Sequence, residues 1–307
     1  MGVSSLPIPV RRSRLSLRTK EALWFHVFIG PWIVGFLAFT FYPTLASVYY
    51  SFTQYNAIRP PVFIGLDNYR VLLQDPVFAK SLAVTFYYAA VAIPLHLVVG
   101  LTLAVLLNQR IPAMPLIRTI YYLPTVMPVV VVALVWIWLF DYNFGLINFL
   151  IYLASGLHGP NWLGDPYWVM PAIIFASLWS VGGSMIIYLA GLQSTPPELY
   201  EAAEIDGAGR VRRFFTITIP MVSPVIFFNL VIGLIGALQI FANVYVLTGG
   251  GPNYASYMYN LYLYNNAFTY FKLGLASAQA WILFVIILAL SYVFFRSAGR
   301  WVYYGGS

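Results

Sequence analysis

The chain has 307 residues, of which 61% are hydrophobic and 8% are charged, and its mean hydropathy is +0.80. An ordinary soluble domain carries about 25% charged residues, so the composition excludes a soluble globular enzyme and a disordered chain and leaves an integral membrane protein. The net charge of +7 comes from Lys and Arg at the ends of apolar runs, a pattern that indicates membrane topology and disfavours nucleic acid as a partner.

Six stretches are long and apolar enough to cross a membrane as helices, a task that takes about 20 residues. They lie at about residues 23–49, 82–107, 119–140, 169–192, 220–247 and 277–295. Residues 142–164 hold only a short apolar run, at 145–155, followed by glycines and a proline, which predicts an interfacial or re-entrant loop. Residues 254–271 are rich in Tyr and Asn. That composition is typical of the membrane boundary and predicts an interfacial helix.

The distribution of basic residues predicts the orientation of these spans. Twelve of the 16 Lys and Arg residues fall on one side and four on the other. Cytoplasmic loops carry the excess of positive charge, so both chain ends are predicted to be cytoplasmic. The expected regions are a cytoplasmic tail at residues 1–22, a first transmembrane helix at 23–50, an extracytoplasmic loop at 51–80, a core of five transmembrane helices at 81–296, which includes a cytoplasmic segment at 194–219, and a second cytoplasmic tail at 297–307.

The spans lack the groups that several membrane functions require. They contain no Asp, Glu, Lys or Arg, whereas ion-coupled carriers use an intramembrane ionisable group. No P-loop and no zinc or hydrolase motif occurs, which disfavours a membrane enzyme and places any nucleotide on another chain. His26 and His96 are expected to be structural. For Asn229 and Asn243, bonding between helices and contact with a ligand are equally good interpretations.

One cytoplasmic segment gathers four of the nine acidic residues of the chain. Thr195 as N-cap, Pro196 as first helical residue and Glu198 as third match a capping box. Gly207 supplies a stop signal. The segment therefore predicts a short helix at residues 196–206, which is either a docking element or simply a solvated loop helix.

The same segment resembles the EAA loop of bacterial ABC-importer permeases. The resemblance rests on the spacing of Glu201-Ala202-Ala203, Gly207, Ile217 and Pro220, with Ile219 where that family prefers Leu. Residues 65–78 and 246–252 resemble the carbohydrate-uptake branch of the family. The likeness covers about residues 24–295 and is closest to the first-permease type of the maltose, lactose and glycerol-phosphate importers.

The resemblance implies an all-α membrane protein with six transmembrane helices and the type I ABC-importer permease fold, in the bacterial cytoplasmic membrane. The implied function is translocation of a sugar by alternating access, and the expected sugar is an oligosaccharide. The implied partners are a second permease, two ATPase subunits that bind ATP and Mg, an extracytoplasmic solute-binding protein, the sugar and membrane lipid. The chain itself is expected to bind no cofactor and no metal and to catalyse no reaction. The alternatives are a glycerol-3-phosphate or other polyol importer and, less well supported, an ion-coupled secondary carrier.

The resemblance also implies two sets of functional residues. Coupling to the ATPase is expected from Glu201, Ala202, Ala203, Asp206 and Gly207. The substrate path is expected along Trp179, Ser180, Gly183, Gly233, Gly236, Gln239 and Asn243. Small residues also serve close helix packing in membranes, and Trp179 could equally face lipid. Because some relatives place every sugar contact on one permease, this subunit could also contribute none.

Overall fold

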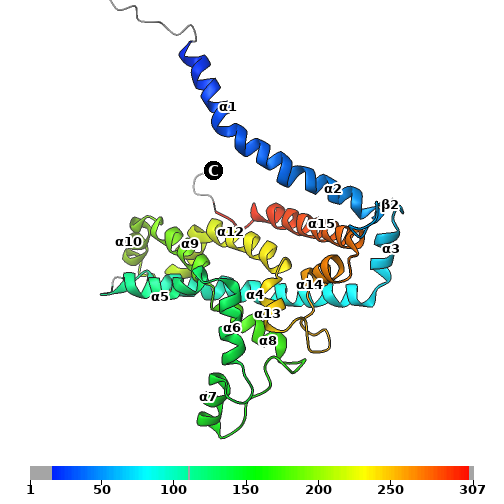
Figure 1. Ribbon diagram of the computed structural model, residues 1–307. Helices are drawn as coiled ribbons and strands as arrows, with labels where there is room; N and C mark the ends of the chain where they lie inside the picture. Colours follow the sequence, from blue (N-terminus) through cyan, green and yellow to red (C-terminus); the bar gives the residue numbers. More distant parts are fainter. Residues whose placement is uncertain (1–15, 110, 304–307) are drawn as a thin grey trace, which may run out of the picture.

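Figure 1 shows the computed structural model of the protein, which describes residues 16–109 and 111–303 as a mostly helical chain. Four continuous helices are long and apolar enough to cross a membrane: Leu17–Ser51, Pro76–Leu107, Arg210–Leu238 and Leu273–Ala298. Two further helix pairs, bent by 99° and 46°, qualify when each pair is counted as one span. On that count, the described part of the chain holds the six predicted spans.

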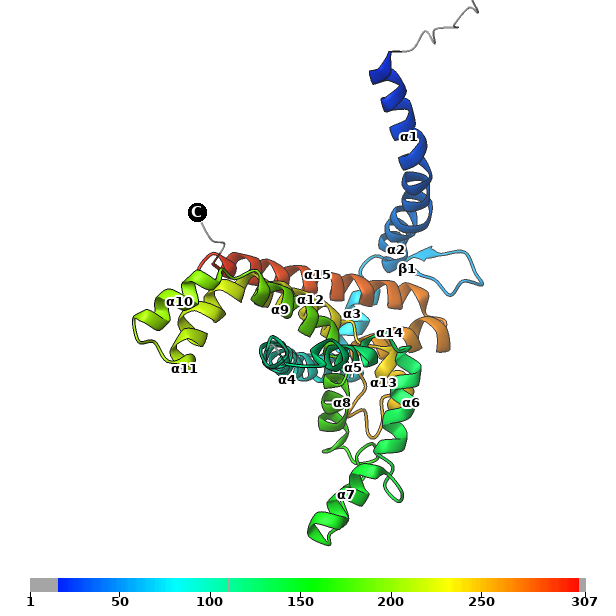
Figure 2. The same cartoon turned by 90° about the vertical axis from the view of Figure 1, so that its left-hand side faces the viewer.

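The first span is a continuous helix made of α1 (Leu17–Phe36), a π-helical turn η1 (Leu37–Phe41) and α2 (Tyr42–Ser51). It begins before the predicted start because Ser16 caps it, its side chain accepting a hydrogen bond from the Thr19 N–H at 3.1 Å. No residue of α1 is buried. The helix projects from the rest of the protein in both views (Figures 1 and 2). Arg11, Arg12 and Arg14 of the predicted tail lie outside the described residues.

A small polar unit follows at the end of α2. Strand β1 (Thr53–Gln54) pairs antiparallel with β2 (Val62–Phe63), and α3 (Asp67–Gln74) leads into α4 (Pro76–Leu107). The Asn68 amide donates to the carbonyls of Ser51 and Thr53, both at 2.9 Å. Asp75 caps α4 by accepting from the Val77 N–H at 2.8 Å. These bonds fix the hairpin and α3 to the end of the first span.

The third predicted span, at 119–140, is present as a bent pair of helices. Helices α5 (Met114–Val126) and α6 (Val129–Leu139) meet at 99°. The cause is Pro128, which lacks a backbone N–H and restricts the preceding residue to extended backbone. Met127 accordingly has φ −71° and ψ 142°. Helix α7 (Leu146–Ser155) follows and lies far from α4 and α12 in both views (Figures 1 and 2).

The fourth span is a bent pair of helices, and the fifth is a continuous helix that ends earlier than predicted. Helices α8 (Val169–Leu178) and α9 (Gly182–Gln193) meet at 46°. After α10 (Pro197–Ile205), the helix made of α11 (Arg210–Arg213), η2 (Phe214–Thr218) and α12 (Ile219–Leu238) is continuous. It ends nine residues before the predicted end at 247, because the backbone of Phe241 leaves the helical region (φ −143°, ψ −66°). Residues Ala242–Leu247 form a separate helix, α13.

The tyrosine-rich segment at 254–271 is partly buried: Tyr257 and Tyr262 are buried, whereas Phe268 and Tyr270 are exposed. Its place at the membrane boundary stays a prediction. It forms α14 (Tyr259–Tyr264) and a π-helical turn η3 (Asn265–Thr269), and α15 (Leu273–Ala298) follows. Tyr259 is fully buried. Its N–H donates to Thr85 Oγ1 and its hydroxyl to the Gln279 carbonyl, both at 2.8 Å. The aromatic side chains therefore join α4 to α15.

Helix α4 is the centre of the packing and contacts α8, α9 and α12. One apolar core joins α4, α6, α8 and the chain from α12 to α15. A second core lies where α4 meets α9 and α12, around Met185, Tyr188 and Val222. At Gly100 of α4 an added Cβ would stand 3.0 Å from Ser184 Oγ, so a small residue is needed for the close approach of α9. These contacts hold α4, α9 and α12 side by side around the space described next.

Candidate functional site

A cavity of about 490 Å³ lies between α4, α8, α9, α12 and α13. Its polar lining residues are Tyr88, His96, Ser177, Ser180, Ser184, Asn229 and Asn243. No Asp, Glu, Lys or Arg is among the described residues that line it. Ligand cavities in proteins measure about 300–1,000 Å³. The lining combines apolar surface with uncharged hydrogen-bonding groups, which suits a neutral solute rich in hydroxyl groups.

His96 of α4 and Ser177 of α8 form a hydrogen bond across one wall of this cavity. His96 Nε2 lies 2.9 Å from Ser177 Oγ, and the Ser177 hydroxyl donates to the Ile174 carbonyl at 2.6 Å. Since a hydroxyl has one proton to donate, His96 Nε2 is the donor in the first bond, and Nδ1 is the acceptor of the ring. The bond joins α4 to α8, and the same residue also lines the cavity, so the expected structural role of His96 stays a prediction.

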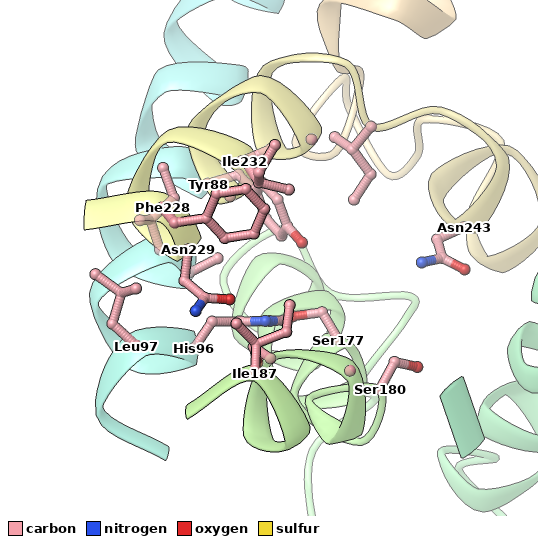
Figure 3. A pocket seen from close by; sticks show the side chains of 18 residues that line it. Tyr88, His96, Leu97, Ser177, Ser180, Ile187, Phe228, Asn229, Ile232 and Asn243 are labelled. Carbon is pink, nitrogen blue, oxygen red and sulfur yellow. The ribbon is translucent and has the colours of Figure 1, made fainter. Parts of the chain in front are cut away.

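Two asparagines lie on opposite sides of the cavity (Figure 3). Asn229 of α12 lies beside His96, and its amide donates to the Val225 carbonyl at 2.9 Å within its own helix. Asn243 of α13 lines the cavity from the far side. This bond of Asn229 is local to α12, so it does not tie two helices together. The Oδ1 atom of Asn229 remains as an acceptor toward the cavity.

The glycines of the fourth and fifth spans divide into two kinds. A Cβ at Gly182 would meet the Tyr121 carbonyl at 2.5 Å, which makes Gly182 the contact where α9 packs on α5. A Cβ at Gly236 meets nothing within 4 Å, and one at Gly233 only touches Ile93 at 3.9 Å. Gly183 lies between these cases, with Thr125 at 3.3 Å. Gly183, Gly233 and Gly236 line the cavity, and Gly182 does not.

The structure brings five of the seven predicted path residues to the cavity: Ser180, Gly183, Gly233, Gly236 and Asn243. Trp179 lies outside the lining and stacks edge-on against Trp136 at 5.8 Å between ring centroids. Gln239 also lies outside the lining, and its carbonyl accepts from the Asn260 amide at 2.8 Å. Tyr88 and Ser177 were missed by sequence reasoning. The available signal was a polar side chain within an apolar span.

The predicted short helix is present as α10, and its residues are exposed. Glu201, Ala202, Asp206 and Gly207 are exposed, and Ala203 is half-buried. The predicted capping box is wrong. Thr195 does not cap the helix; its hydroxyl donates back to the Gly191 carbonyl at 3.4 Å, and the helix begins after Pro196 with no side-chain cap.

The end of α10 is a complete Schellman motif centred on Gly207. Gly207 has φ +75°, a left-handed conformation that favours glycine. Its N–H donates to the Glu204 carbonyl at 3.0 Å, and the Ala208 N–H donates to the Ala203 carbonyl at 2.8 Å. The motif reverses the chain so that α11 runs back from α10. It also satisfies the last carbonyls of the helix.

Two side-chain contacts join α10 to the long helix that contains α12. The Arg213 guanidinium donates to Glu204 Oε2 at 2.7 Å. The Tyr200 hydroxyl lies 3.0 Å from Thr218 Oγ1, one residue before α12 begins. Since α11, η2 and α12 are continuous, a displacement of α10 acts on the helix that carries Asn229, Gly233 and Gly236.

A bundle with several spans around an uncharged cavity defines a multi-pass membrane transport subunit. The sequence profile of the family described as binding-protein-dependent transport system inner membrane component matches residues 96–302. The chain belongs to this family. It is therefore an inner-membrane component of a transport system that works with partner proteins, and not the catalytic subunit of that system.

Relatives match over nearly the full length. The chain is 40% identical to the probable ABC transporter permease protein YesP of Bacillus subtilis over 96% of both chains. It is 34% identical to the trehalose/maltose transport system permease protein MalF of Thermococcus litoralis, over 91% of this chain and 95% of that one. It is also 34% identical to the lactose transport system permease protein LacF of Rhizobium radiobacter, over 93% and 97%.

A solved structure has the same arrangement of helices. It is a chain of a bacterial alginate ABC transporter, crystallised in complex with an alginate pentasaccharide-bound periplasmic protein. The two chains superpose with a TM-score of 0.82 at 25% identity, over 94% of this chain and 98% of that one. The predicted all-α, type I importer fold and the predicted inner-membrane location are confirmed.

Proposed function

We propose that the chain is one of two permease subunits of an ATP-driven importer and translocates a neutral saccharide by alternating access. The observation that carries this proposal is the coupling of α10 to the cavity. Helix α10 is exposed, and the Glu204–Arg213 ion pair and the Tyr200–Thr218 contact join it to the helix that forms one wall of the cavity. A force applied at α10 from outside this chain would therefore move the cavity wall.

The surface around α10 fits a protein partner. Large apolar side chains stand exposed beside its acidic groups, with Ile205 87% and Val211 72% exposed. The small side chains of Ala202 and Ala203 permit a close approach, and Glu201 offers a carboxylate for a charge-assisted hydrogen bond. In our proposal, an ATPase subunit binds here, through Glu201, Ala202, Ala203, Asp206 and Gly207. ATP and Mg bind to that subunit, and this chain holds neither cofactor nor metal.

The cavity supports a sugar as the transported solute. Hydroxyl, imidazole and amide groups are distributed around apolar and aromatic surface, which matches the alternating polar and apolar faces of a pyranose. Relatives named for lactose and for trehalose or maltose transport agree with this chemistry. A relative named for sn-glycerol-3-phosphate transport is also 36% identical. The cavity lining of the described chain holds no cation for a phosphate, so a neutral oligosaccharide is the better fit.

The first span supports a second permease as partner. The apolar stretch of Leu17–Ser51 is 0% buried within the chain. Helix α1 stands away from the bundle, and a second membrane subunit would cover much of this surface. In the same proposal, both termini are cytoplasmic, the polar unit of β1, β2 and α3 faces outward, and a solute-binding protein delivers the sugar there.

Copurification and uptake test the proposal together. The chain, tagged in its native membrane and purified in mild detergent, is expected to retain a second permease and an ATPase. The Gly207→Asp variant is expected to lose the ATPase while keeping the second permease, because the aspartate strains the left-handed turn beside the docking surface. Isolation of the chain alone, together with solute uptake driven by an ion gradient, would contradict the proposal and favour a secondary carrier.

A further inference from the structure

A second cavity, of about 530 Å³, lies at the end of the bundle opposite α10, where the β1–β2 hairpin meets the start of α15 (Figure 1). It is lined by the loop that follows β1, by α3 and by residues 270–275. The Gly274 N–H donates to the Tyr55 carbonyl at 3.1 Å. A Cβ at Gly274 would meet the Thr53 carbonyl at 2.0 Å. The hairpin and α15 are thus in backbone contact beside the cavity.

Two cations from distant parts of the chain line this cavity. They are Arg59 of the hairpin loop and Lys272 before α15. Neither makes an ion pair with any residue in the described part of the chain. No acidic residue lines the cavity, and Asp67, the acid next to the lining residue Asn68, is paired with Arg70 at 3.3 Å. In the proposed orientation four Lys and Arg residues face outward, and two of them line this cavity.

An apolar groove of about 380 Å³ lies along α2 and α15, and its lining residues Phe52 and Tyr69 are the chain neighbours of Thr53 and Asn68, which line the cationic cavity. It is lined by Val48, Phe52, Tyr69, Trp281, Ile282, Val285 and Ile286. Leu275 of the cationic cavity and Ile282 of the groove are seven residues apart on α15, so they share a helix face. A rise of 1.5 Å per residue places Ile282 about 10 Å further along the helix. The Trp281 indole N–H of α15 donates to Ser47 Oγ of α2 at 3.1 Å, so a hydrogen bond joins the two helices beside the groove.

We infer that these two spaces form one binding site for an anionic glycerophospholipid of the outer leaflet. The phosphate lies between Arg59 and Lys272 at the membrane boundary, and an acyl chain lies in the groove between α2 and α15. The inference rests on the proposed function for the outward orientation alone. Such a lipid would cover the surface where α2 and the hairpin already contact α15.

The two spaces together favour a lipid over other occupants. A soluble phosphate or sugar phosphate would use the cations but leave the apolar groove empty. A docking protein would use the exposed loop but does not reach the half-buried side chains between α2 and α15. A diacyl phospholipid with a negative headgroup matches both parts, at the depth that a membrane boundary sets.

Lipid retention measured by native mass spectrometry tests the site. The complete complex is purified, exchanged into mixed micelles with equal parts of phosphatidylglycerol and phosphatidylcholine, and analysed for bound lipid. We expect the wild type to retain phosphatidylglycerol in preference, and the Arg59→Gln/Lys272→Gln variant to lose that preference by about tenfold. Val285→Trp, which fills the groove, is expected to reduce retention of both lipids.

A control removes one positive charge from the same side and is compared with Arg59→Gln and Lys272→Gln as single variants. Lys80→Gln leaves the cavity and the Arg70–Asp67 pair intact, because Lys80 does not line the cavity and does not take part in that pair, and is expected to keep the preference. Equal loss in the control, or no preference in the wild type, would overturn the proposal. Displacement of phosphatidylglycerol by inorganic phosphate without any effect of Val285→Trp would identify a soluble-anion site and would equally overturn it.

Orientation is measured separately. The chain has no cysteine, so Ile58→Cys, at a position that is 82% exposed, can be labelled by a membrane-impermeant maleimide in intact cells. Labelling with no lipid preference counts against the lipid site alone. A lipid preference without labelling counts against the proposed topology, and therefore against the outer leaflet as the source of the lipid.

Discussion

Arg213 holds the carboxylate of Glu204 at 2.7 Å, which links α10 to the helix that runs without interruption from Arg210 to Leu238. Arg213 is largely buried, with 19% of its side chain exposed, whereas Glu204 is 71% exposed. The buried partner is thus on the long helix and the solvated one on α10. A pair of this kind couples the positions of the two helices, and its contribution to the stability of the fold is the smaller effect.

We expect loss of this ion pair to uncouple ATP hydrolysis from uptake. Glu204→Gln should lower sugar uptake about threefold while the ATPase stays bound, because a pair whose carboxylate is 71% exposed contributes less than about 1 kcal/mol. The measurement is uptake per ATP hydrolysed in proteoliposomes. Arg212→Gln is the control, since Arg212 is exposed and makes no ion pair among the described residues. A change of equal size in Arg212→Gln would contradict the prediction.

Gly207 and Gly209 offer a matched pair for the turn after α10. Gly207→Ala should destabilise the turn by about 1 kcal/mol because its φ is +75°, and should weaken retention of the ATPase. Gly207→Asn should be milder, since asparagine tolerates this conformation. Gly209 has φ −66° and no atom within 4 Å of an added Cβ, so Gly209→Ala should behave as wild type. ATPase retention on an affinity column distinguishes these outcomes.

Filling the cavity should stop uptake without unfolding the protein. Gly236→Leu adds a side chain into open space, so we expect normal yield and assembly and loss of nearly all uptake. Gly182→Leu, whose Cβ would meet the Tyr121 carbonyl at 2.5 Å, should instead reduce the yield of folded protein. Size-exclusion profiles and uptake are measured for both. Normal uptake in Gly236→Leu would place the substrate path elsewhere.

The His96–Ser177 hydrogen bond should matter to substrate affinity. His96→Leu removes a bond worth about 0.5–1.5 kcal/mol and a polar group that lines the cavity, so we expect the KM for uptake to rise about tenfold with folded yield retained. His26→Leu is the control, because His26 lies on exposed α1 and bonds only within its helix, to the Ala22 carbonyl at 2.6 Å. An unchanged KM in His96→Leu would show that His96 is only structural.

The sequence by itself determined the class of this protein and the position of the exposed helix α10. Apolar stretches of about 20 residues predict membrane-spanning helices. A helix pairs its own backbone N–H and C=O groups, and leaving these groups unpaired in lipid is too costly. The helix ending at Gly207 was also predictable, since residue preferences at a helix end act over a few neighbouring residues. The bend at Pro128 has a local cause too, although the apolar run around it concealed the break.

Only the tertiary structure decided which residues share the cavity. His96 and Ser177 are 81 residues apart, and no local pattern predicts their contact. Gly182 and Gly236 look alike in sequence, yet one is a packing contact and the other opens to the cavity, because that difference depends on which helix lies opposite. Arg59 and Lys272 likewise line one cavity only because backbone contacts bring the hairpin to the start of α15. Contacts of this kind are set by how the helices pack, which the composition of each helix does not specify.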